Sequence, residues 1–145
     1  MKNKEEMLEL IEVLKATSQF IGDTRANLCA PYGLSPIQGI IVLDVYHHPS
    51  ATKITDICKR LNKSTNTISP LVNRLVDRGL LYKRQSQKDN RVFEVFLSDS
   101  GHAMMNEFNK ELLSFASPIF NRLTDEEFGS LFVSLKALNK VCGLE

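Results

Sequence analysis

Two short amphipathic segments joined by only two residues constrain the fold of this chain more than any other feature of its sequence. The first segment, with Thr52 placed to cap it, has apolar side chains at the spacing of one helix face: Ile54, Ile57, Cys58 and Leu61. After a turn at Asn62 and Lys63, Ser64 can cap a second helix that Gly79 stops. The apolar face of this second helix comprises Ile68, Leu71, Val72, Leu75 and Val76. So short a turn between two helices predicts a helix-turn-helix.

Two segments rich in β-forming residues follow directly. They cover residues 80–86 and 92–98, and the polar residues 87–91 between them supply a turn. The sequence therefore predicts a two-stranded hairpin immediately after the second helix. A helix-turn-helix followed by such a hairpin is a winged-helix arrangement.

Helical patterns precede this module. A long helix is expected over about residues 4–30, where apolar residues fall near a seven-residue repeat, and the segment 30–33 breaks it. Ser35, Pro36 and Gln38 then form a start signal for a largely apolar helix.

Helical patterns also follow the module. Beyond residue 101, apolar side chains step by three and four along two helices. Pro118 should bend or interrupt the first, and a capping box at residues 124–127 starts the second. A small central module cannot bury all of these terminal stripes, which indicates a homodimer built from both ends of the chain.

The expected fold class is mainly α with a small β-hairpin wing: a winged helix-turn-helix that dimerises through its N- and C-terminal helices. The expected division is an N-terminal dimerisation helix over 1–34, a DNA-binding module over 35–100 and C-terminal dimerisation helices over 101–145.

Positive charge is concentrated in the middle of the chain. The formal net charge of the 145 residues is only +1. Residues 53–91 nevertheless hold ten basic and three acidic side chains, a net +7, while the remaining 106 residues hold eight basic and fourteen acidic ones, a net −6. A basic centre between acidic flanks suggests that one face meets a polyanion, although a solvated lysine-rich surface is the alternative.

The second helix of the helix-turn-helix has an unusual polar face. It is made mostly of short donors and acceptors, which suit base edges and phosphates in a major groove better than an ordinary solvent face would. Pro70 would lie inside this helix at a cost of about 3 kcal/mol, and close packing against DNA is one reason to retain it. The alternative is a helix that starts later, with Pro70 in its first turn. The candidate contacts are Thr65, Asn66, Thr67, Ser69, Pro70, Asn73 and Arg74.

The tip of the hairpin carries Arg91, two residues after Asp89. An arginine at this position can enter a minor groove, and a bidentate contact with the Asp89 carboxylate could set its direction. A plain surface ion pair, worth about 0–1 kcal/mol, is the alternative. Lys53, Lys83 and Lys88 are weaker candidates for phosphate contacts.

These motifs together resemble the MarR family of bacterial transcription regulators. The resemblance rests on the runs LVNRLVDRGLLYKR and KDNRVFEVFLSDSG, in which Asp89 and Arg91 match the family's D-x-R wing. Leu97, Ser98 and Gly101 match its L-[TS]-x-x-G pattern. The resemblance implies a dimer on a pseudo-palindromic double-stranded DNA operator, with recognition helices in successive major grooves and wings in the flanking minor grooves. It also implies a possible small aromatic or phenolic effector.

Other chemistry has little support in the sequence. The cysteines Cys29, Cys58 and Cys142 have no paired spacing, which indicates a reducing cytoplasm without disulfides. The three histidines form no chelating cluster, and no phosphate loop, nucleophile elbow or H-E-x-x-H motif is present, so we expect no metal, no cofactor and no enzymatic activity.

Two alternatives to a ligand-responsive repressor remain open. One is a winged-helix module that binds a protein partner and does not read DNA. The other is a redox-switched regulator that uses Cys29, which follows the long first helix. No apolar run approaches the roughly 20 residues needed to span a bilayer, so no membrane partner is expected.

Overall fold

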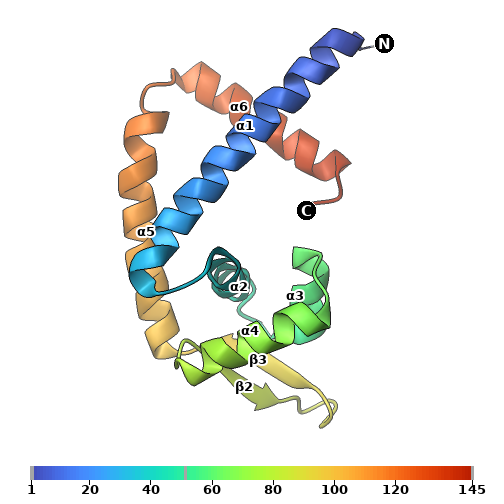
Figure 1. Cartoon of the computed structure of the whole chain (residues 1–145), viewed down its shortest axis with the longest axis vertical. Coiled ribbons are helices and arrows are strands. Elements are labelled where there is room, and N and C mark those ends of the chain that lie inside the picture. The colour runs from blue at the N-terminus through green and yellow to red at the C-terminus, as the bar shows by residue number, and fades with distance from the viewer. Residues whose placement is uncertain (1, 51, 145) are drawn as a thin grey trace. The chain divides into compact units, whose positions relative to one another are not determined.

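The computed structural model describes residues 2–50 and 52–144 (Figure 1). In chain order its elements are α1 (Lys4–Cys29), the 3₁₀ turn η1 (Ala30–Tyr32), α2 (Pro36–His47), β1 (Thr52–Lys53), α3 (Ile54–Leu61), α4 (Thr65–Asp77), β2 (Leu81–Gln85), β3 (Phe93–Leu97), α5 (Asp99–Phe120) and α6 (Asp125–Val141). The chain up to Phe108 forms one compact unit, and the chain from Asn109 onward forms another. The predicted winged helix-turn-helix is confirmed.

The predicted capping boxes start two of the helices. At α2, the Ser35 hydroxyl accepts from the Gln38 N–H at 3.4 Å and the Gln38 side chain accepts from the Ser35 N–H at 3.0 Å. At α6, Thr124 and Glu127 exchange the same pair of bonds at 3.2 and 2.8 Å, and the bond from the Thr124 backbone lowers the pKa of the Glu127 carboxyl. Local polar signals therefore determine where these helices begin.

The hairpin belongs to a three-stranded antiparallel sheet with strand order β1-β3-β2. Its register pairs Leu81 with Leu97 and Gln85 with Phe93 across β2 and β3. The third strand was not predicted: Thr52 pairs with Val95 in β1, where it is buried. The prediction that Thr52 caps α3 is therefore wrong.

The start of α3 is capped differently. Lys53 is the N-cap residue, and the Asp56 carboxylate accepts from its backbone N–H at 2.9 Å. The Thr52 hydroxyl instead donates to the His48 carbonyl at 2.9 Å. A strand of only two residues is too short to show an alternating pattern in the sequence. Thr52 was therefore predicted to cap the helix that follows it.

One hydrophobic core holds the helix-turn-helix against the sheet. Its fully buried side chains come from α1, α2, α3, α4, β2 and β3: Cys29, Ile41, Val42, Val45, Ile57, Ile68, Val72, Leu75, Leu81 and Val95. Gly79, with a φ of 73°, ends α4 in the left-handed conformation that favours glycine and turns the chain into β2. Helix α4 and the hairpin thus pack on one common core.

Apolar side chains remain exposed on the terminal helices of each unit. On α1 they include Met7, Leu10, Ile11, Phe20 and Ile21. In the second unit, no described residue of α6 is buried, and its exposed apolar side chains include Phe128, Leu131, Leu135 and Leu138. Such stripes are too large to be ordinary solvent surface.

Helix α5 continues through Pro118 and ends two residues later, at Phe120. The proline therefore lies in the last turn of the helix rather than interrupting its middle. Among the described residues, no single helix is long and apolar enough to cross a membrane. The segments Lys4–Tyr32 and Pro36–His47 reach that limit only as a pair, by length and composition, and they are bent by 88°.

Candidate nucleic-acid interface

Helix α4 divides its side chains between the core and solvent. Ile68, Val72 and Leu75 are buried. The predicted contacts lie on the solvent side: Thr65, Asn66, Thr67, Pro70, Asn73 and Arg74 are exposed, and Ser69 is partly exposed. The structure therefore places all seven predicted residues on the accessible surface of one rigid helix.

Pro70 lies inside α4, because the helix already begins at Thr65. The alternative, a later start with Pro70 in the first turn, is therefore wrong. Proline has no N–H, so the Asn66 carbonyl lacks its usual i+4 donor in the helix. Both Asn66 and Pro70 are exposed residues, so this interruption of the helix bonding lies on the solvent side of α4.

Ser64 occupies the predicted N-cap position of α4, but its side chain makes no capping bond to the backbone. Its hydroxyl instead lies 3.0 Å from the Thr67 hydroxyl. Thr65 at the start of the helix lies 3.8 Å, oxygen to sulfur, from Cys58 of α3. The beginning of α4 is thus organised by side chains that also belong to the candidate surface.

Lys83 connects the sheet to the same surface. From β2, its ammonium group donates to the Asn73 side-chain oxygen. This contact holds Asn73 in one orientation and gives Lys83 a role besides the predicted phosphate contact. The other two candidates, Lys53 and Lys88, are exposed.

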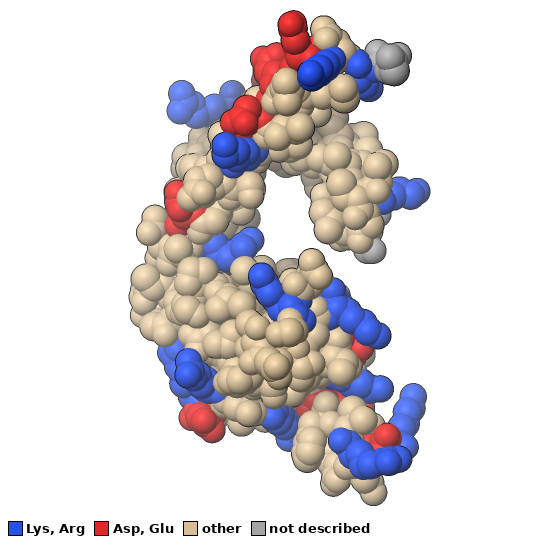
Figure 2. Space-filling view, turned by 45° about the vertical axis from the view of Figure 1, so that its right-hand side comes forward, with Lys and Arg blue, Asp and Glu red and all other residues tan. Residues whose placement is uncertain are grey.

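The hairpin tip presents Arg91 to solvent, with 93% of its side chain exposed. The Arg91 N–H and Nε–H both donate to a single Asp89 oxygen, at 3.0 and 3.4 Å. The predicted bidentate contact is therefore wrong: the tight turn brings backbone and side chain to the same oxygen. Figure 2 shows Lys and Arg side chains gathered around the protruding tip at the lower right.

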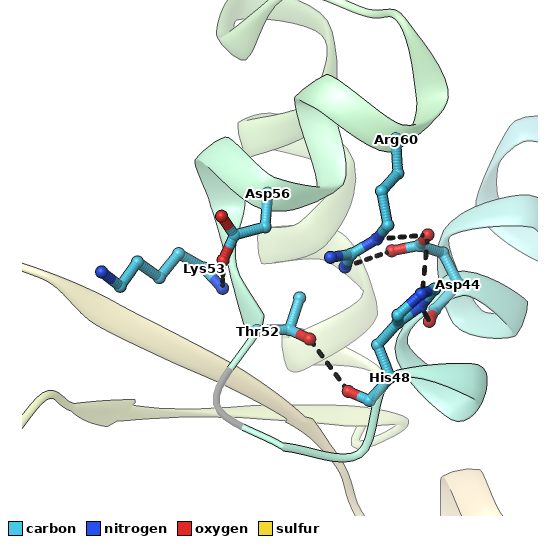
Figure 3. Close-up of polar contacts among 6 residues, drawn as sticks. All are labelled: Asp44, His48, Thr52, Lys53, Asp56 and Arg60. Carbon is cyan, nitrogen blue, oxygen red and sulfur yellow. Dashed lines mark hydrogen bonds and ion pairs between the residues drawn. The ribbon is translucent and has the colours of Figure 1, made fainter. Parts of the chain in front are cut away.

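A polar cluster that sequence reasoning missed fastens the helix-turn-helix to α2 (Figure 3). Arg60 of α3 donates from Nε and Nη2 to the two carboxylate oxygens of Asp44, each at 2.8 Å. The side chain of Asp44 is only 7% exposed and that of Arg60 is 28% exposed. The hydrogen bond to Asp44 raises the pKa of the Arg60 guanidinium. This pair fixes α3, and through it α4, against the core.

His48 extends the cluster. Its Nδ1 lies 2.7 Å from the Asp44 carbonyl oxygen, which can only accept, so Nδ1 carries a proton in this contact. The Thr52 hydroxyl donates in turn to the His48 carbonyl. Asp44, His48 and Thr52 follow one another at intervals of four residues, but Arg60 lies 16 residues from Asp44. Only the tertiary fold brings Arg60 to Asp44, so residue spacing gave no signal for that ion pair.

Cys29 is buried in the core at the end of α1. Its sulfur lies where a side chain on residue 39 would stand, 2.4 Å from a Cβ built on Gly39. Burial raises the pKa of the Cys29 thiol. A buried, protonated thiol is a poor nucleophile, so the structure argues against the redox alternative.

We expect iodoacetamide to modify the exposed Cys142 at least about tenfold faster than Cys29 in the folded protein, because alkylation requires an accessible thiolate. Mass spectrometry of peptides from a labelling time course measures both rates. The same reaction in denaturant is the control and should remove the difference. Rapid native labelling of Cys29, or DNA release by peroxide that is abolished in Cys29→Ser, would restore the redox hypothesis.

Comparisons with known proteins find similar helix-turn-helix transcriptional regulators. A sequence model of the MarR family matches residues 32–91. The uncharacterized HTH-type transcriptional regulator YwhA of Bacillus subtilis is 28% identical over 118 residues, 81% of each chain. The HTH-type transcriptional repressor MdtR of the same organism is 23% identical over 128 residues, 88% of this chain and 82% of MdtR.

Solved structures share the fold. A MarR family protein from Bacillus stearothermophilus matches with a TM-score of 0.86 and 16% identity, covering 99% of both chains. MepR of S. aureus, solved as a MepR–DNA complex, matches with a TM-score of 0.73 and 18% identity, covering 90% of this chain and 94% of MepR.

Proposed function

Since the chain belongs to the MarR family of winged-helix transcriptional regulators, we propose that it binds double-stranded DNA as a homodimer and represses transcription until a small effector releases it. The observation that carries this proposal is the solvent face of α4, where short hydrogen-bonding side chains stand on a rigid helix beside a basic wing. A regulator of chromosomal operators works in the cytoplasm, and we propose that location.

The proposed DNA contacts divide by groove. The exposed face of α4 enters a major groove, which is wide enough for a helix, while Arg91 at the wing tip enters the adjacent minor groove. Lys53 and Lys88 supply phosphate contacts, which give affinity but little sequence selectivity. We retain the division of the chain at residues 34/35 and 100/101 between dimerisation helices and DNA-binding module as part of the proposal.

The exposed apolar side chains of α1, and separately those of α6, support the dimer. A second copy is the partner best matched to them, because each copy offers the same stripes. Two-fold symmetry then predicts a pseudo-palindromic operator with half-sites about 10 base pairs apart. An effector, expected to be a small aromatic or phenolic compound, acts by preferring a dimer whose recognition helices do not match this spacing.

The first experiment is selection from a randomised duplex pool at two salt concentrations, with binding followed by fluorescence anisotropy and the bound fraction sequenced. A salt-sensitive, two-fold symmetric motif supports the regulator. Salt-sensitive binding without a motif would indicate an architectural protein. No binding by a folded, dimeric, ligand-free protein at either salt would favour the protein-binding alternative.

Arg91→Ala should weaken operator binding about tenfold, since the substitution removes one charge-assisted hydrogen bond worth about 1.5 kcal/mol. The effect should be largest on sites with narrow flanking minor grooves, where the negative potential is deepest. Anisotropy titrations on matched operators that differ only in their flanks measure this effect, with Arg91→Lys as the charge-preserving control. An unchanged affinity would remove the wing from the interface.

Asn66→Ala and Arg74→Ala should each reduce discrimination among operator variants, by about 1–3 kcal/mol for every base that the removed side chain recognises. Lys53→Ala is the matched control, because removing a phosphate-binding charge should weaken all sequences alike. Competition binding across a set of single-base operator variants separates the two patterns. A uniform weakening for Asn66→Ala or Arg74→Ala would assign that residue to the DNA backbone instead of the bases.

A further inference from the structure

The end of the recognition helix is tied to the turn that leaves α1. Arg78, the C-cap residue of α4, donates from Nη1 to the Gly33 carbonyl at 2.8 Å and from Nη2 to the Tyr32 carbonyl at 2.6 Å. The two nitrogens of one planar guanidinium thus hold two consecutive carbonyl groups that lie 45 and 46 residues earlier in the chain. A fork of this kind fixes direction as well as distance.

The turn at residues 30–34, to which Arg78 donates, is held by its own backbone hydrogen bonds. Gly33 has a φ of 64°, a conformation that favours glycine, and its N–H donates to the Ala30 carbonyl at 2.9 Å. The Leu34 N–H donates to the Cys29 carbonyl at 3.2 Å. The side chains of Leu34 and Cys29 are both buried in the core. The carbonyls that face Arg78 therefore have fixed positions relative to the end of α1.

We propose that Arg78 is a specificity-determining residue, which sets the operator spacing by holding α4 at a fixed position relative to α1. The inference rests on the proposed function, because it requires α1 to lie in the dimer interface and α4 in the groove. Since α1 carries exposed apolar residues, a dimer that buries them transmits its geometry to each α4 through this turn. Arg78 acts on DNA recognition through the position of the helix.

DNA geometry makes such a constraint measurable. Moving one half-site by one base pair changes the separation by about 3.4 Å and the orientation by roughly 35°. A dimer with firmly held recognition helices must deform the DNA to accept that change. A dimer with loosely held helices accommodates it by moving the helices instead.

The test uses the selected operator and two derivatives with the centre shortened or lengthened by one base pair. The wild-type protein should prefer the selected spacing by about tenfold or more, the cost of deforming the DNA. For Arg78→Ala this preference should fall below about threefold, and Arg78→Lys, which keeps the charge without the planar fork, should lie between the two. Lys63→Ala is the control, because it removes an exposed charge from the same module and should weaken all three operators equally.

Arg78→Ala could instead bind all three operators more weakly by the same factor and so keep the wild-type preference for the selected spacing. That result would overturn this inference and leave the proposed function standing. Absence of wild-type binding to any operator would overturn the proposed function, and the inference with it. Circular dichroism melting checks that each variant is folded. If Arg78→Ala does not fold, Arg78→Lys decides the question, since retention of the full wild-type preference in that variant would also overturn the inference.

Discussion

Arg60→Ala is expected to lower the free energy of unfolding by about 3 kcal/mol, the lower end for breaking a buried ion pair. The substitution removes two 2.8 Å hydrogen bonds from the Asp44 carboxylate, which is 7% exposed and has little access to water in their place. His48 reaches the Asp44 carboxylate only at 3.7 Å and does not replace them. The lower end applies because the Arg60 side chain is 28% exposed, so water can enter part of the space that it leaves.

Urea denaturation at one fixed protein concentration measures the change, since a dimer's stability depends on concentration. Lys59→Ala, an exposed neighbour on the same helix, is the matched control and should change stability by less than about 0.5 kcal/mol. Replacing both partners, as in Asp44→Leu with Arg60→Met, should recover much of the stability because no buried charge remains. A decrease below about 1 kcal/mol in Arg60→Ala would place the pair among ordinary surface ion pairs.

This ion pair and the capping boxes differ in how far they can be predicted from sequence. Ser35 and Gln38 are three residues apart, so their contact follows from helix geometry alone. Asp44 and Arg60 are 16 residues apart, and their contact depends on how α2 and α3 pack. Periodicity identifies which face of a helix is buried, but it does not say which distant polar group that face meets.

In the candidate interface, too, some features could be predicted from the sequence and others depend on the tertiary fold. Asn66 and Arg74 could be assigned to the solvent side of α4 because a helix with a clear apolar face leaves only one other side. The contact between Lys83 and Asn73 depends on how β2 approaches α4, and spacing along the chain gives no sign of it. The error at the wing tip is of a different kind: Asp89 and Arg91 are in contact, but the backbone N–H and the Nε–H of Arg91 share one Asp89 oxygen, so the contact is not bidentate.

Gly101→Ala is expected to destabilise the protein by about 3 kcal/mol, at the upper end for overpacking. Gly101 is buried in the first turn of α5, and a Cβ on it would lie 2.2 Å from the Leu80 carbonyl oxygen and 2.6 Å from Leu97 Cδ2. The nearer group is backbone at the start of the wing, so it cannot rotate away as a side chain could. Alanine's better helix propensity returns only about 1 kcal/mol, which the clash outweighs.

Gly129→Ala is the matched control, since Gly129 is also helical but has no heavy atom within 4 Å of a built Cβ. At this position the higher helix propensity of alanine is the only expected effect, and it should stabilise the protein by up to about 1 kcal/mol. Thermal melting of the two variants at equal concentration should therefore give shifts of opposite sign. Shifts of the same sign would mean that α5 can move away from the Leu80 backbone at little cost.

The packing at Gly101 also gives a physical reason for the L-[TS]-x-x-G pattern. The Ser98 hydroxyl accepts from the Gly101 N–H at 3.0 Å and donates to the Gly79 carbonyl at 2.5 Å, so one side chain caps α5 and holds the end of α4. Leu97 packs beneath the same turn, and the missing side chain of Gly101 lets the Leu80 backbone pass against it. Because recognition helix, wing and α5 meet at this point, Gly101→Ala at temperatures below its melting transition should also weaken operator binding, whereas Gly129→Ala should leave it unchanged.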